Sequence, residues 1–144
     1  MRKQSGFTIW EVMVVMAIIA ILAGIAIPNY LSWLPKQRLR NAASDLRANM
    51  QNARLVAVKQ NGNCSVTFNT SNDSYAIPCL NKTVRLSDYD PAVGFSSVSA
   101  TGQVIFTSRG MITDDTLFDV TIGNDNQEYN IKVFPTGAIF SDAL

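Results

Sequence analysis

The sequence feature that most constrains the fold is an apolar stretch at residues 7–27, which contains a single charged residue, Glu11. At the α-helical rise per residue, this stretch would span roughly 31 Å, close to the ~30 Å hydrocarbon thickness of a bilayer. The apolar run continues to Pro28 without the small-residue exit that is typical of a secretory signal peptide. We therefore expect a membrane-spanning helix that is retained as an anchor and lies in lipid.

A short segment with two basic residues, 1–6, precedes the apolar stretch and ends in Gly6. Because glycine lets a protease approach the backbone closely, the favoured cleavage site in this region lies after Gly6. Cleavage there would remove residues 1–6 as a leader peptide and make Phe7 the new N-terminus. Charge alone leaves the topology open, since basic residues at 36–40 follow the stretch closely.

Glu11 needs compensation, because a carboxylate at the centre of a membrane helix costs about 2.5–3.5 kcal/mol on insertion scales. One interpretation places Glu11 in the first helical turn, near headgroup depth and the positive end of the helix dipole. The other pairs Glu11 with the α-amine that cleavage would create on Phe7, in its own chain or in a neighbour. We favour the second interpretation.

The run KQSGFTIWEVMVVMAIIAILA resembles the class III signal and N-terminal helix of type IV pilins and type II secretion pseudopilins. Gly6, Phe7 and Glu11 match the pattern, whereas Trp10 stands where leucine is usual. The resemblance implies that a prepilin peptidase cuts between Gly6 and Phe7 and methylates the Phe7 amine. It also implies that Glu11 contacts the N-terminus of a neighbouring subunit during assembly.

The same resemblance implies a location and a set of partners. The chain would be a single-pass protein of the bacterial inner membrane with its C-terminal head exported, and would then enter a pilus or pseudopilus. Its partners would be the prepilin peptidase, other pilins or pseudopilins, the inner-membrane assembly platform and, before assembly, membrane lipid.

Helix-breaking residues mark the exit from the membrane segment. Gly24 lowers helix stability, and Pro28 and Pro35 each remove a helical hydrogen bond, so the region 7–35 is predicted to end in kinks. In the resembled family such a glycine-to-proline segment can lose its helicity when subunits pack into a filament. Residues Gly24 to Pro28 are therefore a predicted local melting point.

Residues 36–61 form a predicted amphipathic helix whose apolar face repeats at spacings of four and three. This face comprises Leu39, Ala43, Leu46, Met50, Ala53 and Ala57. The stripe is short and rich in alanine, which favours packing against a sheet over a coiled-coil seam. Asn61 and Gly62 tolerate the left-handed conformation of a helix C-terminal cap, so we expect the helix to end there.

Alternating apolar residues after Gly62 predict a β hairpin in which Phe68 lies opposite Tyr75. The same register places Cys64 opposite Cys79, which makes a disulfide geometrically reasonable. Two free buried thiols are the alternative. A second hairpin is predicted across the turn at 123–127, in which apolar residues face one another; these are Phe118, Val120 and Ile122 on one strand and Ile131, Val133 and Tyr129 on the other.

Further short strands are predicted at 83–86, 94–98, 103–107 and 138–140. The fold class is therefore α+β, a long N-terminal helix packed on an antiparallel β-rich head at residues 62–144, and the fold is expected to be type IV pilin-like. The runs VIFTSRG at 104–110 and IKVFPTGAI at 131–139 are similar to the C-terminal domain of the minor pseudopilin H and FimT/FimU minor pilin group. Ala138 departs from the small basic residue usual in that group.

Composition argues against catalysis. The sequence contains no histidine, which removes the usual general base and the commonest transition-metal ligand, so we predict no catalytic residues, no metal site and no cofactor. Asp114, Asp115, Asp119 and Asp125 lack the spacing of a calcium-binding EF-hand, and a solvated loop is favoured. Arg109 could bind a partner, but a local cap or ion pair within the head is favoured.

Three functions of different classes fit the sequence to different degrees. The leading one is a minor pilin or minor pseudopilin, a structural subunit of a type IV pilus or type II secretion pseudopilus. A DNA-binding minor pilin of a DNA-uptake machine is the alternative, with phosphate contacts from Arg85, Arg109 or the basic residues of 36–59. The acidic head argues against it, since residues 60–144 hold four basic residues against nine acids. A membrane-anchored hydrolase is the least supported.

Overall fold

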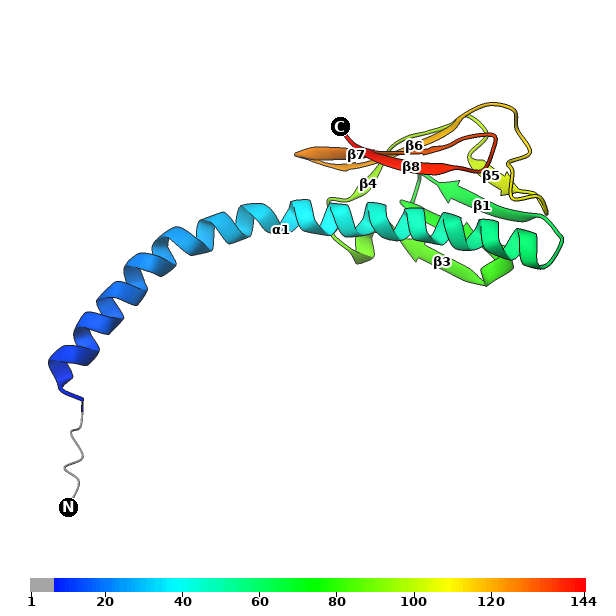
Figure 1. Ribbon diagram of the computed structural model, residues 1–144. Coiled ribbons are helices and arrows are strands. Elements are labelled where there is room, and N and C mark those ends of the chain that lie inside the picture. The colour runs from blue at the N-terminus through cyan, green and yellow to red at the C-terminus, as the bar shows by residue number, and fades with distance from the viewer. Residues whose placement is uncertain (1–6) are drawn as a thin grey trace, which may run out of the picture. The chain divides into compact units, whose positions relative to one another are not determined.

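The structure is a computed structural model that describes residues 7–144. The predicted leader, with Gly6, lies outside the described residues. The chain divides into two compact units, Met1–Leu34 and Pro35–Leu144. A single helix, α1 (Ile9–Lys59), supplies residues to both units (Figure 1).

In the first unit, α1 exposes its apolar side chains. The isoleucines and leucines from Ile9 to Leu31 are more than half exposed, including Ile21 at 67% and Leu22 at 61%. This stretch is long and apolar enough to cross a membrane. None of the residues in its most apolar 18-residue segment is buried. An exposed apolar surface of this extent is stable against lipid or other protein surfaces rather than water.

The helix is continuous through Gly24, Pro28 and Pro35. Each proline deletes one backbone bond, and a long helix can carry such a loss when the flanking turns remain bonded. Local melting between Gly24 and Pro28 concerns a filament rather than a single chain, and it stays a prediction.

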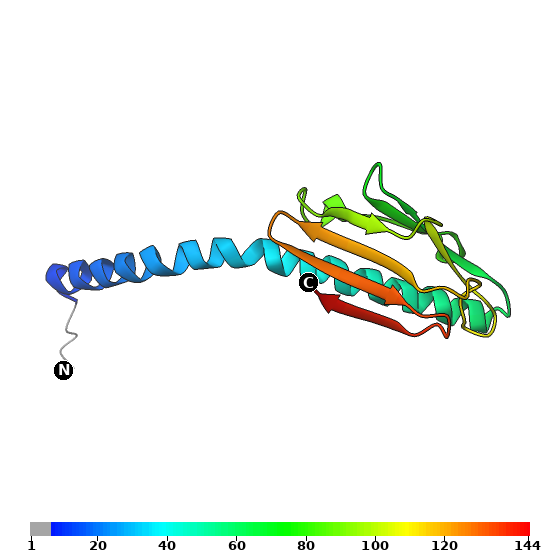
Figure 2. The same ribbon diagram turned by 90° about the horizontal axis from the view of Figure 1, so that it is seen from above.

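The second unit packs the C-terminal part of α1 on two antiparallel four-stranded sheets (Figure 2). The first sheet has the order β3-β2-β1-β5, with β1 (Cys64–Asn69), β2 (Ser74–Ile77), β3 (Lys82–Arg85) and β5 (Gln103–Phe106). The second has the order β4-β6-β7-β8, with β4 (Gly94–Val98), β6 (Phe118–Asn124), β7 (Gln127–Val133) and β8 (Ile139–Ala143). A short 3-10 helix at Pro78–Leu80 connects β2 to β3, and a second one at Leu86–Asp88 follows β3.

The predicted apolar face of α1 forms one side of the head's core. All six of its residues are at most 3% exposed, and Ala42 and Asn49 are buried beside them. The other side comes from both sheets, through residues such as Val66, Phe106 and Val120. Packing against sheets, rather than a coiled-coil seam, is therefore confirmed for this stripe.

The end of the helix follows from two residues. Asn61 has a φ of 48°, in the left-handed region. The Gly62 N–H then donates to the Ala57 carbonyl at 3.1 Å, which satisfies an otherwise unpaired carbonyl of the last turn. The predicted cap is confirmed.

Both predicted hairpins are present, and the first has the predicted register. Phe68 lies opposite Tyr75 in the first hairpin. In the second, Val120 lies opposite Ile131 and Ile122 opposite Tyr129. These pairs place large apolar side chains on one face of each sheet, which is why a one-residue shift would expose them.

Cys64 and Cys79 form a disulfide with a Cα–Cα distance of 5.7 Å. It joins the first residue of β1 to the 3-10 helix Pro78–Leu80, where the ladder between β1 and β2 has already ended. The bridge therefore closes the open end of the hairpin.

Replacing both Cys64 and Cys79 with serine is expected to lower the free energy of unfolding by about 3 kcal/mol. The bridge closes a loop with a sequence separation of 15 residues, and the chain-entropy model gives about that value. Denaturant titration followed by far-UV circular dichroism measures the change. Thiol labelling of the exported wild-type chain should succeed only after reduction, and labelling without reduction would show the free pair instead.

Candidate functional site

The N-terminal end of α1 is built from a reciprocal pair, Thr8 and Glu11. The Glu11 N–H donates to Thr8 Oγ1, and the Thr8 N–H donates to Glu11 Oε2, both at 3.3 Å. This arrangement is a capping box, in which two N–H groups that lack a helical partner are satisfied by side chains. In the single chain, Glu11 thus lies in the first helical turn and caps the helix, as in the first of the two interpretations of the sequence. Its pairing with a Phe7 amine stays a prediction.

An apolar surface adjoins this capping box. Phe7, Val12, Val15 and Ile19 line, together with Glu11, an open pocket of about 340 Å³. Phe7 itself is 84% exposed. The only carboxylate of the apolar stretch therefore lies beside the predicted new N-terminus, on a surface suited to lipid tails or to another helix.

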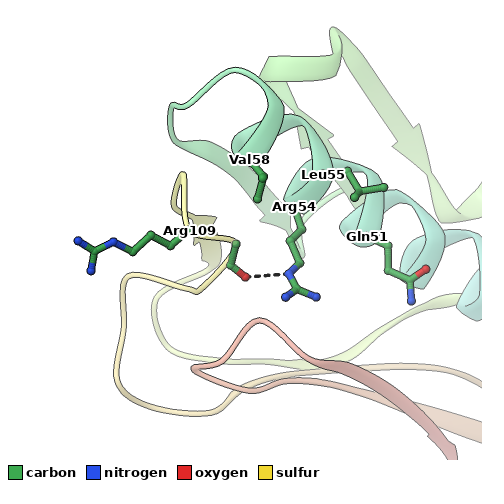
Figure 3. Close-up of a pocket in the computed structure, with 6 residues that line it drawn as sticks. Gln51, Arg54, Leu55, Val58 and Arg109 are labelled. Atoms are coloured by element: carbon green, nitrogen blue, oxygen red, sulfur yellow. Dashed lines mark hydrogen bonds between the residues drawn. The ribbon is translucent and has the colours of Figure 1, made fainter.

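In the head, Arg54 of α1 meets the two glycine turns that carry the second resemblance. Its Nε donates to the Gly110 carbonyl at 2.8 Å (Figure 3). Gly110 and Gly137 have φ values of 73° and 79°, which favour glycine. A Cβ on Gly137 would collide with the Gly110 carbonyl and with Arg54 Nε. The two motif turns are therefore parts of one junction on α1.

The role of Arg54 was missed by the sequence reasoning, which treated it as one of several basic helix residues. The available signal was the pair of glycine turns, because two tight turns that pack together leave carbonyl groups in need of a donor. Arg109, in contrast, was expected to cap or pair locally. It is exposed and extends away from α1 (Figure 3), and within residues 7–144 the single ion pair is Arg38–Asp90. That expectation is wrong.

A buried polar network fixes α1 to the first sheet. The Asn49 amide donates to Tyr75 Oη at 2.7 Å, and Lys82 Nζ donates to Asn49 Oδ1 at 2.8 Å. Burial raises the pKa of Tyr75 to about 12, so the phenol stays neutral at physiological pH. Both the nitrogen and the oxygen of the Asn49 amide are hydrogen-bonded, and this network specifies how the helix packs on the strands.

Two further contacts hold the same helix to the loop that follows β3. The Tyr89 hydroxyl donates to Asp45 Oδ2 at 2.6 Å, and burial together with this bond raises the pKa of Tyr89. Arg38 Nη1 lies 2.8 Å from Asp90 Oδ2, and this bond lowers the pKa of Asp90. All of these contacts position the helix, and none presents a nucleophile next to a base.

The candidate calcium ligands do not converge. Within residues 7–144, no group of three or more His, Cys, Asp or Glu side chains is arranged to hold a metal ion. Asp114 and Asp115 lie on an exposed loop before β6, whereas Asp119 lies on β6 itself.

Comparison with known families agrees with this reading of the chain. Residues 1–27 match the prokaryotic N-terminal methylation motif, and residues 42–137 match the family described as type II transport protein GspH. The chain belongs to the GspH family. Both halves of the resemblance drawn from the sequence are thereby confirmed, including the one that rests on the two glycine turns.

Individual relatives of this GspH-family chain come from pili and from secretion systems. A fimbrial protein of Pseudomonas aeruginosa is 46% identical over 48 residues, which are 33% of this chain and 31% of that protein. The chain thus spans about a third of the length of this relative.

Solved structures show the same fold at low sequence identity. The type IV minor pilin FimU of Pseudomonas aeruginosa superposes with a TM-score of 0.63 at 16% identity, over 78% of this chain and 96% of FimU. The minor pseudopilin EpsH from the type 2 secretion system of Vibrio cholerae gives 0.59 at 10% identity, over 74% of this chain and 97% of EpsH. The predicted α+β, pilin-like fold is confirmed.

Proposed function

We propose that this chain is a minor pilin or minor pseudopilin that is cut after Gly6 and enters a helical filament through its N-terminal helix. The observation that carries the proposal is the coexistence of the methylation motif at 1–27 and a GspH-family head at 42–137 in one chain. The exposed apolar half of α1 supports it, because such a surface can exchange lipid contacts for helix contacts. In this proposal the chain resides first in the inner membrane with its head exported.

Glu11 is the central assembly residue of the proposed mechanism. In a low-dielectric setting its carboxylate compensates the charged amine of a neighbour's Phe7, and this attraction is much stronger than in water. Prepilin peptidase supplies that amine by removing the leader. The assembly platform of the inner membrane then adds the subunit to the growing filament.

Mass spectrometry of the chain purified from its own cells tests the processing. We expect an N-terminal peptide that begins at Phe7 and is heavier by one methyl group. A Gly6→Val variant is the control, because a branched side chain at the cleavage site should leave the Met1 terminus intact. An intact Met1 terminus in the wild-type chain would contradict the proposal.

The neighbouring genes distinguish the two kinds of filament. A secretin together with secretion components would indicate a pseudopilus, and a retraction motor together with adhesion factors would indicate a retractile pilus. The DNA-uptake alternative has less support, since residues 60–144 hold four basic residues against nine acids and two of the basic side chains in the chain are already bound. Arg38 pairs with Asp90, and Lys82 binds Asn49.

A further inference from the structure

One stripe of α1 in the head carries three arginines spaced seven residues apart. Seven residues return to nearly the same face of a helix and correspond to a separation of about 10 Å. Between the arginines lie uncharged residues at spacings of four and three. We define the arginine stripe as Arg40, Ser44, Arg47, Gln51, Arg54 and Val58.

Two surface pockets lie in a row along the arginine stripe. The first, of about 400 Å³, is lined by Arg40, Ser44 and Arg47 together with Tyr129 of β7 and Ser141 of β8. The second, of about 420 Å³, is lined by the rest of the stripe, by Leu55 and by the Arg109–Gly110 turn (Figure 3). The stripe therefore has open space along its length rather than a cover of other side chains.

Two arginines of the stripe, Arg47 and Arg54, are positioned by neutral groups. Arg47 Nη1 donates to Ser141 Oγ at 3.3 Å, and Arg54 Nε donates to the Gly110 carbonyl at 2.8 Å. Arg47 Nε is buried and has no hydrogen-bond partner among the described residues. Across residues 7–144, no carboxylate lies within ion-pair distance of these two arginines, of Arg40 or of Arg109. These four positive charges therefore have no ion-pair partner among the described residues.

Arginines held in this way are prepared to bind carboxylates. A guanidinium group presents paired N–H donors that match a carboxylate, and less ordering is needed when the side chain is already fixed. The pocket at Arg54 also exposes apolar surface, with Leu55 60% and Val58 48% exposed. A nucleic-acid backbone would leave these aliphatic side chains uncovered, whereas a protein segment with both acidic and aliphatic residues would cover them.

We propose that the arginine stripe and Arg109 form the docking site for an acidic segment of a neighbouring pilin-family subunit, with carboxylates about 10 Å apart. The inference rests on the proposed function and adds the chemistry by which the head selects its neighbour. Electrostatic complementarity of this kind fixes register and suppresses wrong partners.

Photo-crosslinking in cells that assemble the filament tests the site on the full-length chain. A photoreactive amino acid replaces Gln51 in the second pocket, and the control replaces Ser71 in the turn between β1 and β2. We expect a covalent adduct at position 51 with a pilin-family subunit, through a peptide that contains Asp or Glu. An adduct with nucleic acid or lipid at position 51, or no adduct in filaments that contain the chain, would overturn the inference.

Charge reversal provides the second measurement. With Arg40 and Arg109 both changed to glutamate, the adduct yield should fall by about tenfold or more, since close charge pairs commonly couple by at least that factor. Both residues are exposed and neither side chain makes a hydrogen bond within the described residues, so the fold should persist. The matched control is Arg85→Glu on β3, which is also exposed and should leave the yield unchanged.

Rescue and incorporation separate the two levels of the proposal. Changing the crosslinked acidic residue of the partner to lysine should restore the yield with the Arg40→Glu, Arg109→Glu chain. An unchanged yield after charge reversal would refute the docking site while leaving the proposed function intact. Failure of the wild-type chain to enter any filament would instead refute the proposed function itself.

Discussion

Glu11→Gln is expected to insert into the membrane and lose its leader normally, yet to enter filaments at no more than about a tenth of the wild-type level. Glutamine keeps an oxygen that can accept the Thr8 N–H, so the capping box survives the change. The charge that would compensate the Phe7 amine of a neighbour is lost. The amount of chain in sheared filaments, relative to the amount in the membrane, measures the effect.

Thr8→Ala provides the matched control, because it removes the hydroxyl that accepts the Glu11 N–H while the carboxylate remains. Loss of such a cap costs about 1 kcal/mol of helix stability, so incorporation should remain close to normal. The opposite result, with Thr8→Ala defective and Glu11→Gln normal, would assign Glu11 to helix capping alone. A Glu11→Leu chain should assemble no better than Glu11→Gln, since leucine removes both the charge and the cap acceptor.

The sequence predicts the parts of this fold in which local pattern and tertiary packing agree. The apolar face that contains Leu46 and Met50 is buried as expected, because a stripe with a helical period can be buried only on one side. The register of Phe68 with Tyr75 follows equally, since a shift by one residue would expose both rings. The N-terminal motif is confirmed in the same way, because its residues lie in consecutive positions, and the processing and assembly roles assigned to them stay predictions.

What the sequence leaves out are contacts between residues that are distant along the chain. The eight strands divide into two sheets, and β1 pairs with β5 across an intervening β2–β4 segment. No local pattern encodes that choice. The junction of Arg54 with Gly110 and Gly137 joins three segments in the same way, and its glycines are recognisable only as separate turns.

Leu46→Ala is the substitution expected to damage the head most. Leu46 is fully buried in the core cluster that α1 shares with both sheets, so truncation of its side chain leaves a cavity there. Buried leucine-to-alanine changes cost about 2–5 kcal/mol, a large fraction of the roughly 5–15 kcal/mol that stabilises a typical domain. Denaturant titration of the detergent-solubilised full-length chain, followed by far-UV circular dichroism, measures the loss.

Leu55→Ala is the matched control on the same helix, since Leu55 is 60% exposed. It makes the same chemical change without a cavity and should alter the free energy of unfolding by less than about 0.5 kcal/mol. A similar loss for both variants would mean that helix propensity, rather than burial, holds the helix on the head. That outcome would contradict the assignment of the stripe from Leu39 to Ala57 as the core face of α1, because only packing distinguishes the two leucines.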